Sequence, residues 1–394
     1  MTTYDGAFFD TPVDRRGTAC EKWDALMARE PRVTNPMWVA DMDFRCPDEV
    51  VEALSRRAAH PVYGYTEQTG GAVRAMLDFM ARRHGLVLSA REQIMLPCVV
   101  SGLRAAVLAF TRPGDRVIVQ PPVYGPFYAA IRDNGREAAE CALVRDEQGR
   151  YTMDLDAVEA ALRGGARVMF LCSPHNPVGR VWSRAELDAL LRVLARYDAL
   201  LISDEIHEDF VYERGAFVPV LDAAGAAGVR ALSMTSASKT FNLAGLQQAA
   251  AFSRDGELLQ TLEKKLHDVG VVQGNIFGMA ATEAAFAHGD AWLDALLDYI
   301  REGDAIFREE MAAALPKAVI TPLEATYLAW VDMRAYGLTT ERLMERARAA
   351  GVECTPGTFF GEAAGEGFLR VNLACPHGRV REAARQLGRA VNEN

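Results

Sequence analysis

Residues 167–204 read RVMFLCSPHNPVGRVWSRAELDALLRVLARYDALLISD, and this stretch decides the fold class. It begins with an apolar run at 167–173 and ends with another at 200–204. Between the two runs, leucines recur with the spacing i, i+3, i+4, i+7 at Leu187, Leu190, Leu191 and Leu194. This spacing predicts a helix with one apolar face. Short apolar strands joined by such a helix are typical of a parallel sheet buried on both faces.

The same alternation extends outward to about residues 89–253, with further apolar runs at 116–120, 231–235 and 248–253. We therefore predict an α/β fold with a mostly parallel sheet that helices cover on both sides. Near residue 289 the pattern changes to a long helical stretch, 291–315, which Pro316 ends because proline cannot continue a helix. Strands at 327–332 and 368–373, a helix at 340–350, a loop at 355–361 and a terminal helix complete the chain. These patterns divide it into an N-terminal segment 1–45, a large domain 46–288 and a smaller α+β domain 289–394.

The composition excludes several classes of protein. Half of the 394 residues are apolar, and the net charge of −10 argues against a nucleic-acid partner, which needs clustered Lys and Arg. No apolar run is long enough for a membrane span, and residues 1–16 do not resemble a signal peptide. Seven scattered cysteines without a C-x-x-C pair suggest neither a metal site nor a disulfide framework. We expect a cytoplasmic protein with reduced thiols.

Polar residues gather where the predicted strands end. Residues 173–179 read SPHNPVG, 204–207 read DEIH, 236–239 read SASK, and Ser101 and Gly102 begin a predicted helix. Open α/β sheets bind ligands at the carboxyl ends of their strands. Each feature alone is an ordinary turn, cap or surface lysine. Together they provide an amine, an anion, an amide and helix-start N–H groups, which suit an aldehyde cofactor with a pyridinium ring and a phosphate.

The order of these motifs also carries a family resemblance. N-P-x-G, D-x-x-H, S-x-S-K-T-F-N-x-A-G and F-L-R-V-N follow one another over nearly the whole chain. This order resembles the fold-type I pyridoxal-phosphate enzymes of the aminotransferase class I/II family. RGTACEKWD at 16–24, WVADMDF at 38–44 and PPVYGPF at 121–127 resemble the MalY/PatB-type cystathionine β-lyase branch of that family. The resemblance implies pyridoxal 5'-phosphate as cofactor, bound by the large domain.

The resemblance assigns roles around the cofactor ring. Lys239 would carry the cofactor aldehyde, and Asp204 would pair with the protonated ring nitrogen. Asn176 and His207 would bind the phenolic oxygen, and Tyr124 would stack on the ring. Lys239 would also be the base that removes the α-proton, while either Lys239 or Tyr124 would protonate the departing sulfur.

Further roles concern the phosphate and the assembly. Residues that match the family's phosphate-binding positions are Ser101, Gly102, Leu103 and Ser236. Tyr65 resembles the tyrosine that reaches the phosphate of the neighbouring subunit. The resemblance therefore implies a homodimer with a shared active site, in which residues 1–45 pack against the small domain and the partner.

Two positions bear on the reaction. One holds an arginine that would bind the substrate, and the other lacks an arginine that relatives have. Arg370 matches the residue that binds the substrate α-carboxylate through a bidentate fork, together with Asn176. Gln247 stands eight residues after Lys239, where many aminotransferases of the family have a phosphate-binding arginine. The missing cation favours the lyase branch.

We therefore predict a carbon–sulfur β-lyase that cleaves L-cystathionine or a related cysteine S-conjugate to a thiol, pyruvate and ammonia. One alternative is an aminotransferase of an L-amino acid. The other is a lyase-fold protein with an added regulatory role that binds a partner protein. The preferred sulfur substrate is left open by these motifs, because they do not set the shape of the pocket.

Overall fold

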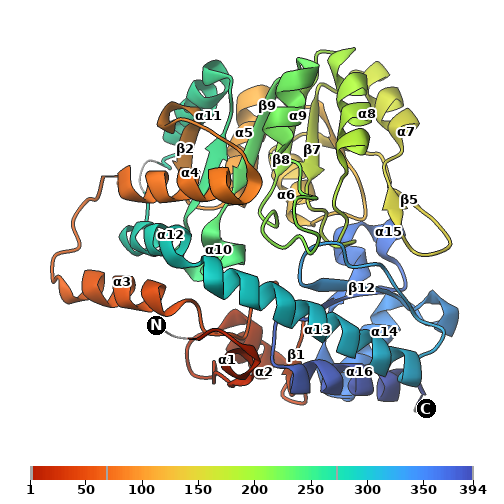
Figure 1. Ribbon diagram of the computed structural model, residues 1–394. Helices are drawn as coiled ribbons and strands as arrows, with labels where there is room; N and C mark the ends of the chain where they lie inside the picture. The colour runs from red at the N-terminus through yellow and green to blue at the C-terminus, as the bar shows by residue number, and fades with distance from the viewer. Residues whose placement is uncertain (1–2, 68–69, 272–273, 393–394) are drawn as a thin grey trace.

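The computed structural model describes residues 3–67, 70–271 and 274–392. Within these residues, a seven-stranded sheet forms the centre of the molecule in the order β2-β10-β9-β8-β7-β3-β4 (Figure 1). Its strands are β2 (Gln93–Leu96), β3 (Arg116–Val119), β4 (Glu137–Glu140), β7 (Val168–Cys172), β8 (Leu200–Asp204), β9 (Ala231–Thr235) and β10 (Ala249–Phe252). The five strands from β4 to β9 are parallel, which confirms the predicted α/β sheet.

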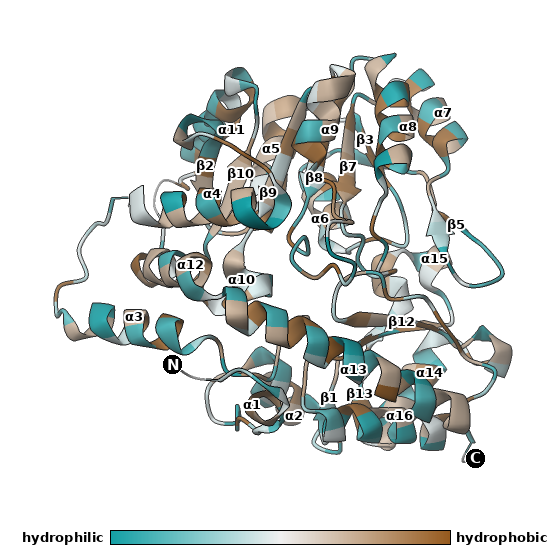
Figure 2. Cartoon of the chain, in the orientation of Figure 1, coloured by the Kyte–Doolittle hydropathy of each residue, from teal (hydrophilic) through white to brown (hydrophobic). Residues whose placement is uncertain are grey.

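Alternating side chains of this sheet enter two separate cores. Ile118 of β3 faces one core, while its neighbours Val117 and Val119 face the other. The first core is covered by α4 (Gly70–His84), α7 (Leu155–Arg163), α8 (Arg184–Ala195), α9 (Val220–Ala227) and α12 (Ile276–His288). The second is covered by α5 (Val99–Phe110), α6 (Pro126–Arg132) and α11 (Gly256–Asp268). Helix α8 illustrates why such helices can cover the sheet. Apolar residues (brown) and polar residues (teal) alternate along it, so one of its faces is apolar (Figure 2).

Strand β10 departs from the sequence prediction in its direction. It occupies nearly the predicted residues but runs antiparallel to both β9 and β2. The connection from β9, residues 236–248, contains only the short helices α10 (Ala237–Thr240) and η3 (Ala244–Leu246), whereas a parallel return is usually made by a full crossover helix. An apolar run does not encode its own direction, so the pattern of residues 248–253 did not reveal this.

The C-terminal part of the chain forms an antiparallel sheet in the order β11-β12-β15-β14. These strands are β11 (Val319–Ile320), β12 (Leu328–Asp332), β14 (Thr355–Pro356) and β15 (Phe368–Asn372). Three helices pack around it, namely α13 (Asp290–Ala314), α14 (Thr340–Ala349) and α16 (His377–Asn392). The boundaries of β12, β15, α13 and α14 lie within one residue of the predicted ones.

The N-terminal segment lies against this C-terminal part (Figure 1). β1 (Asn35–Pro36) pairs in parallel with β13 (Val352–Glu353), and α1 (Gly6–Asp10) packs near α13. Helix α3 (Asp48–Ala59) packs on α12. From these contacts we propose the division into residues 1–45, 46–288 and 289–394. Among the helices of the described residues, none has the length and apolar character needed to cross a membrane.

Candidate active site

A cavity of about 230 Å³ opens at the carboxyl ends of β7, β8 and β9. This is the edge at which parallel α/β sheets bind their ligands. Residues predicted for the site that line it are Tyr124, Asn176, Asp204, His207, Ser236 and Lys239. The fold thus brings together six residues that are spread over more than a hundred positions of the sequence.

Lys239 lies in α10, directly after β9. Its Nζ donates a hydrogen bond to the main-chain oxygen of Ala40 at 2.6 Å. Burial in the protein, followed by the nearby charge of Arg370, lowers the pKa of Lys239 to about 8. A lysine with this pKa has an accessible neutral form near physiological pH, which both a nucleophile and a base require.

Asp204 ends β8 with its carboxyl group at the cavity. Oδ1 accepts a hydrogen bond from the main-chain N–H of Ile206 at 3.1 Å. Burial raises the pKa of Asp204 to about 6, although the Ile206 bond and the charge of Lys239 act in the opposite direction. A buried carboxylate of this kind gains from a cation in the cavity, so Asp204 fits a protonated ring nitrogen.

Arg370, on β15, reaches the site from the small domain. Its Nη1 donates to Asn176 Oδ1 at 3.2 Å, and its Nη2 donates to the Trp38 main-chain oxygen at 2.8 Å and to Thr355 Oγ1 at 3.1 Å. The buried Nε has no hydrogen-bond partner among the described residues. An unused donor on a buried guanidinium fits an anionic ligand such as a carboxylate.

His207 and Tyr124 supply the remaining polar walls. Burial, and then the charges of Lys239 and Arg370, lower the pKa of His207 to about 3, so its ring is neutral. Its buried Nδ1 has no partner within the described part of the chain. Burial raises the pKa of Tyr124, whose ring lies 6.4 Å from the ring of Phe359. Both residues can therefore act as neutral hydrogen-bonding groups toward a cofactor ring.

The cavity wall at α5 differs from the residues predicted to bind the phosphate. Cys98, Val99 and Val100 line the cavity at the start of this helix, rather than Ser101, Gly102 and Leu103. Ser101 Oγ and Gly102 N both donate to the Cys98 main-chain oxygen, and Leu103 is fully buried in the core. The first N–H groups of a helix have no partner within it, so Val99 and Val100 offer the free donors.

The Ser236 hydroxyl is also already hydrogen-bonded within the protein. Its Oγ donates to the Gln248 main-chain oxygen at 2.6 Å and accepts from Ser238 N at 2.9 Å, which caps α10. Ser238 and Gln247 also line the cavity. The Gln247 side chain donates to the Ala244 main-chain oxygen at 3.1 Å. Because glutamine is uncharged, this position brings no cation to the cavity.

Several wall residues had not been predicted from the sequence. They are Ala40, Pro97, Cys98, Val99, Val100, Cys172, Ile206, Ser238, Ala244 and Gln248. The second serine of S-x-S-K could have indicated Ser238. Ala40 and the start of α5 present main-chain groups, for which side-chain identity gives no signal.

Tyr65 does not line the Lys239 cavity of its own chain. It is 95% exposed and lies beside Tyr63, Gly274 and Ile276 at the surface. The segment around it extends away from the body of the molecule between α3 and α4 (Figure 1). The predicted contact of Tyr65 with a partner subunit stays a prediction.

A second group of titratable side chains lies behind the cavity. His84 Nε2 is 2.7 Å from Asp209 Oδ1, and Thr240 Oγ1 donates to Asp209 Oδ2 at 2.6 Å. Glu208 lies close enough to both residues that the three together could hold a metal ion. Burial raises the pKa of Glu208 above its ordinary value. Because Thr240 follows Lys239, this group supports the helix that carries the lysine.

The fold and this arrangement of amine, anion and arginine define a pyridoxal-phosphate site, and the chain belongs to the aminotransferase class I and II family, which it matches over residues 38–387. Among curated proteins it is similar to cystathionine beta-lyase PatB of Bacillus subtilis, with 36% identity over 98% of this chain and 100% of the relative. Protein MalY of Escherichia coli is 30% identical over 97% and 98% of the two chains. The solved structure of cystalysin from Treponema denticola, which contains pyridoxal 5'-phosphate, superimposes with a TM-score of 0.93 at 30% identity and covers 100% of both chains. The predicted family and fold type are confirmed.

Proposed function

We propose that this protein is a pyridoxal-phosphate-dependent carbon–sulfur β-lyase that cleaves L-cystathionine or related cysteine S-conjugates to a thiol, pyruvate and ammonia. The observation that carries the proposal is the placement of the Lys239 amine and the Asp204 carboxyl group at one cavity, with Arg370 hydrogen-bonded to Asn176 of its wall. The similarity to proteins named cystathionine beta-lyase supports the choice of reaction. Gln247, which places no cation at the cavity wall, favours elimination over amino-group transfer.

Several wall residues would hold the cofactor. Pyridoxal phosphate, when bound, supplies a ring that accepts the electrons released at the substrate α-carbon. Asp204 would pair with the ring nitrogen, Asn176 and His207 would bind the phenolic oxygen, and Tyr124 would pack against the ring. The N–H groups of Val99 and Val100 at the start of α5 and the hydroxyl of Ser238 would bind the phosphate.

The substrate-binding and proton-transfer steps use three residues. Arg370 and Asn176 hold the α-carboxylate, which fixes the α-carbon near the Lys239 amine. Lys239 would hold the cofactor in the resting enzyme, and its free amine would remove the α-proton at Nζ. Lys239 or Tyr124 returns a proton to the departing sulfur.

Two further properties belong to the same proposal. We infer a homodimer in which Tyr65 of one subunit completes the phosphate site of the other, and its 95% exposure in a single chain supports this. We also infer a cytoplasmic location, supported by the seven free cysteines.

The test compares two reactions of the same purified protein. With L-cystathionine and no keto acid, the proposal expects pyruvate, with Lys239→Ala as the inactive control. With an amino acid and 2-oxoglutarate, it expects little glutamate. Glutamate formation that outpaces pyruvate release would identify an aminotransferase instead.

A further inference from the structure

Main-chain oxygens of residues 38–43 bind the two cations of the site. Arg370 Nη2 donates to the Trp38 oxygen at 2.8 Å, and Lys239 Nζ donates to the Ala40 oxygen at 2.6 Å. The Tyr327 hydroxyl also donates to the Ala40 oxygen, at 2.9 Å. Residues 38–43 belong to no helix or strand. The positions of Arg370 and Lys239 therefore depend on whatever holds this segment in place.

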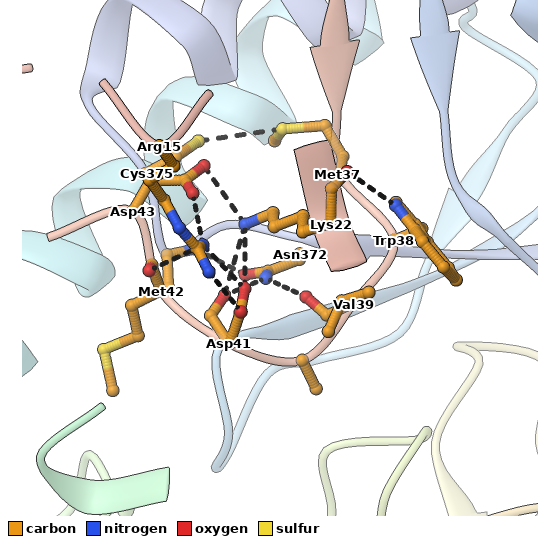
Figure 3. Close-up of polar contacts among 12 residues, drawn as sticks. Arg15, Lys22, Met37, Trp38, Val39, Asp41, Met42, Asp43, Asn372 and Cys375 are labelled. Carbon is orange, nitrogen blue, oxygen red and sulfur yellow. Dashed lines mark hydrogen bonds and ion pairs between the residues drawn. The ribbon is translucent and has the colours of Figure 1, made fainter. Parts of the chain in front are cut away.

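Asn372 provides part of that support. Its Nδ2 donates to the main-chain oxygens of Val39 and Asp41, each at 2.6 Å (Figure 3). Val39 and Asp41 alternate along the chain with Trp38 and Ala40. The segment is thus bound on one side by Asn372 and faces the cavity cations with its other oxygens.

A buried ion cluster provides the rest (Figure 3). Lys22 Nζ lies 3.1 Å from Asp43 Oδ2 and 3.5 Å from Asp41 Oδ1. Arg15 binds both carboxylates, at 2.6 Å to Asp41 and 2.8 Å to Asp43. Arg379 of α16 binds Asp43 as well. The cluster joins residues 38–43 to an earlier part of the N-terminal segment and to the last helix.

The two central members of the cluster are almost inaccessible to water. The side chains of Lys22 and Asp43 are 1% and 3% exposed. Burial alone would raise the pKa of Asp43, yet the charges of Lys22 and Arg379 hold it well below its ordinary value. Moving any member would leave a buried charge without its partner, which is costly. The segment therefore has one strongly preferred position.

We propose that Lys22 and Asp43 are positioning residues that fix residues 38–43, so that the Trp38 and Ala40 oxygens meet Arg370 and Lys239. Neither side chain lines the cavity. Their effect passes through the main chain, because it sets where the guanidinium fork and the free amine point. Small displacements of such groups have large effects on substrate binding and reaction rate. The inference rests on the proposed function only for its kinetic part.

The experiment compares Asp43→Asn with the wild type and with Asp14→Asn. The Asp14–Arg16 pair lies in the same N-terminal segment, but both side chains are 61% exposed, so it is a matched control. Hydrogen–deuterium exchange of the full-length protein without added cofactor is followed for peptides that cover residues 37–44 and, as an internal reference, β8. KM and kcat for L-cystathionine are then measured with the cofactor-loaded enzyme.

We expect exchange of residues 37–44 in Asp43→Asn to be at least about tenfold faster, with β8 unchanged. We also expect KM to rise about tenfold, because Arg370 loses a fixed acceptor, while Asp14→Asn behaves as wild type. If Asp43→Asn does not fold, the double variant Lys22→Met/Asp43→Asn, which removes a cation with the carboxylate, is used in the same measurements.

Unchanged exchange at residues 37–44 would overturn the inference. So would faster exchange combined with wild-type KM and kcat, because the cluster would then be structural only. A wild-type enzyme that releases no pyruvate would contradict the proposed function, but the exchange result would still decide whether the cluster fixes the segment.

Discussion

Replacing Arg370 by lysine should separate charge from geometry at the substrate carboxylate. Lysine keeps the positive charge but replaces the planar fork by a single ammonium group. Arg370 already uses Nη1 for Asn176 and Nη2 for Trp38 and Thr355, and only Nε is unpaired among the described residues. An ammonium group has three donors, so it cannot satisfy these three acceptors and still donate to a substrate carboxylate.

The expected loss is at least one charge-assisted hydrogen bond, about 1.5–3 kcal/mol. At roughly 1.4 kcal/mol for each factor of ten, kcat/KM should fall roughly 10- to 150-fold, mainly through KM. Initial rates of pyruvate release measure this change. Arg334→Lys is the matched control, because Arg334 belongs to the same domain but is 55% exposed and paired with Asp332. A change below about threefold in a folded, cofactor-loaded Arg370→Lys enzyme would refute the assignment.

Three further predictions concern the cofactor side of the site. Burial raises the pKa of Asp204 to about 6, above its unfolded value, so its contribution to stability is present in acid and is lost as the pH rises through 6. Asp204→Asn should therefore stabilise the cofactor-free protein at pH 8 by on the order of 2 kcal/mol, and by less at pH 4.5, which urea unfolding at both pH values measures. The same substitution should abolish turnover in an activity assay. Acylation of Lys239 in the cofactor-free protein should have its midpoint near pH 8, because burial lowers the pKa of this lysine. Peptide mass spectrometry measures the acylation, with the exposed Lys264 as the reference. A midpoint above about 10 would contradict the lowered pKa. Tyr65→Phe should weaken cofactor binding about tenfold, and hybrid dimers with Lys239→Ala subunits should regain one site of wild-type affinity, which a titration of the co-purified hybrid would detect.

Side-chain patterns predicted most of the fold. β8 and β9 occupy the expected residues because each is an apolar run of five residues that ends in polar ones. The large-domain strand β4 was not predicted, since its sequence EAAE contains no apolar run. Strand β10 was found but not its direction, which depends on the connection rather than on the strand itself.

Most of the proposed site residues that act through their side chains could be named from the sequence, although Ser238, which lines the cavity, was not among them. Lys239, Asp204 and Arg370 have few chemical substitutes, so the motifs around them point to a site. At the start of α5 the cavity is lined by Cys98, Val99 and Val100 and not by the predicted Ser101, Gly102 and Leu103, because any residue there can present an N–H group. The Ala40 oxygen left no signal for the same reason. Main-chain groups become visible only once the fold positions them.

The central claim is that Lys239 carries the cofactor. Borohydride reduction of the cofactor-loaded protein, followed by digestion and mass spectrometry, maps the lysine to which pyridoxal phosphate is attached. We expect the modification on the peptide that contains Lys239, in step with loss of activity. Modification of Lys22, Lys264, Lys265 or Lys317 instead, or an active protein with no modified lysine, would contradict it.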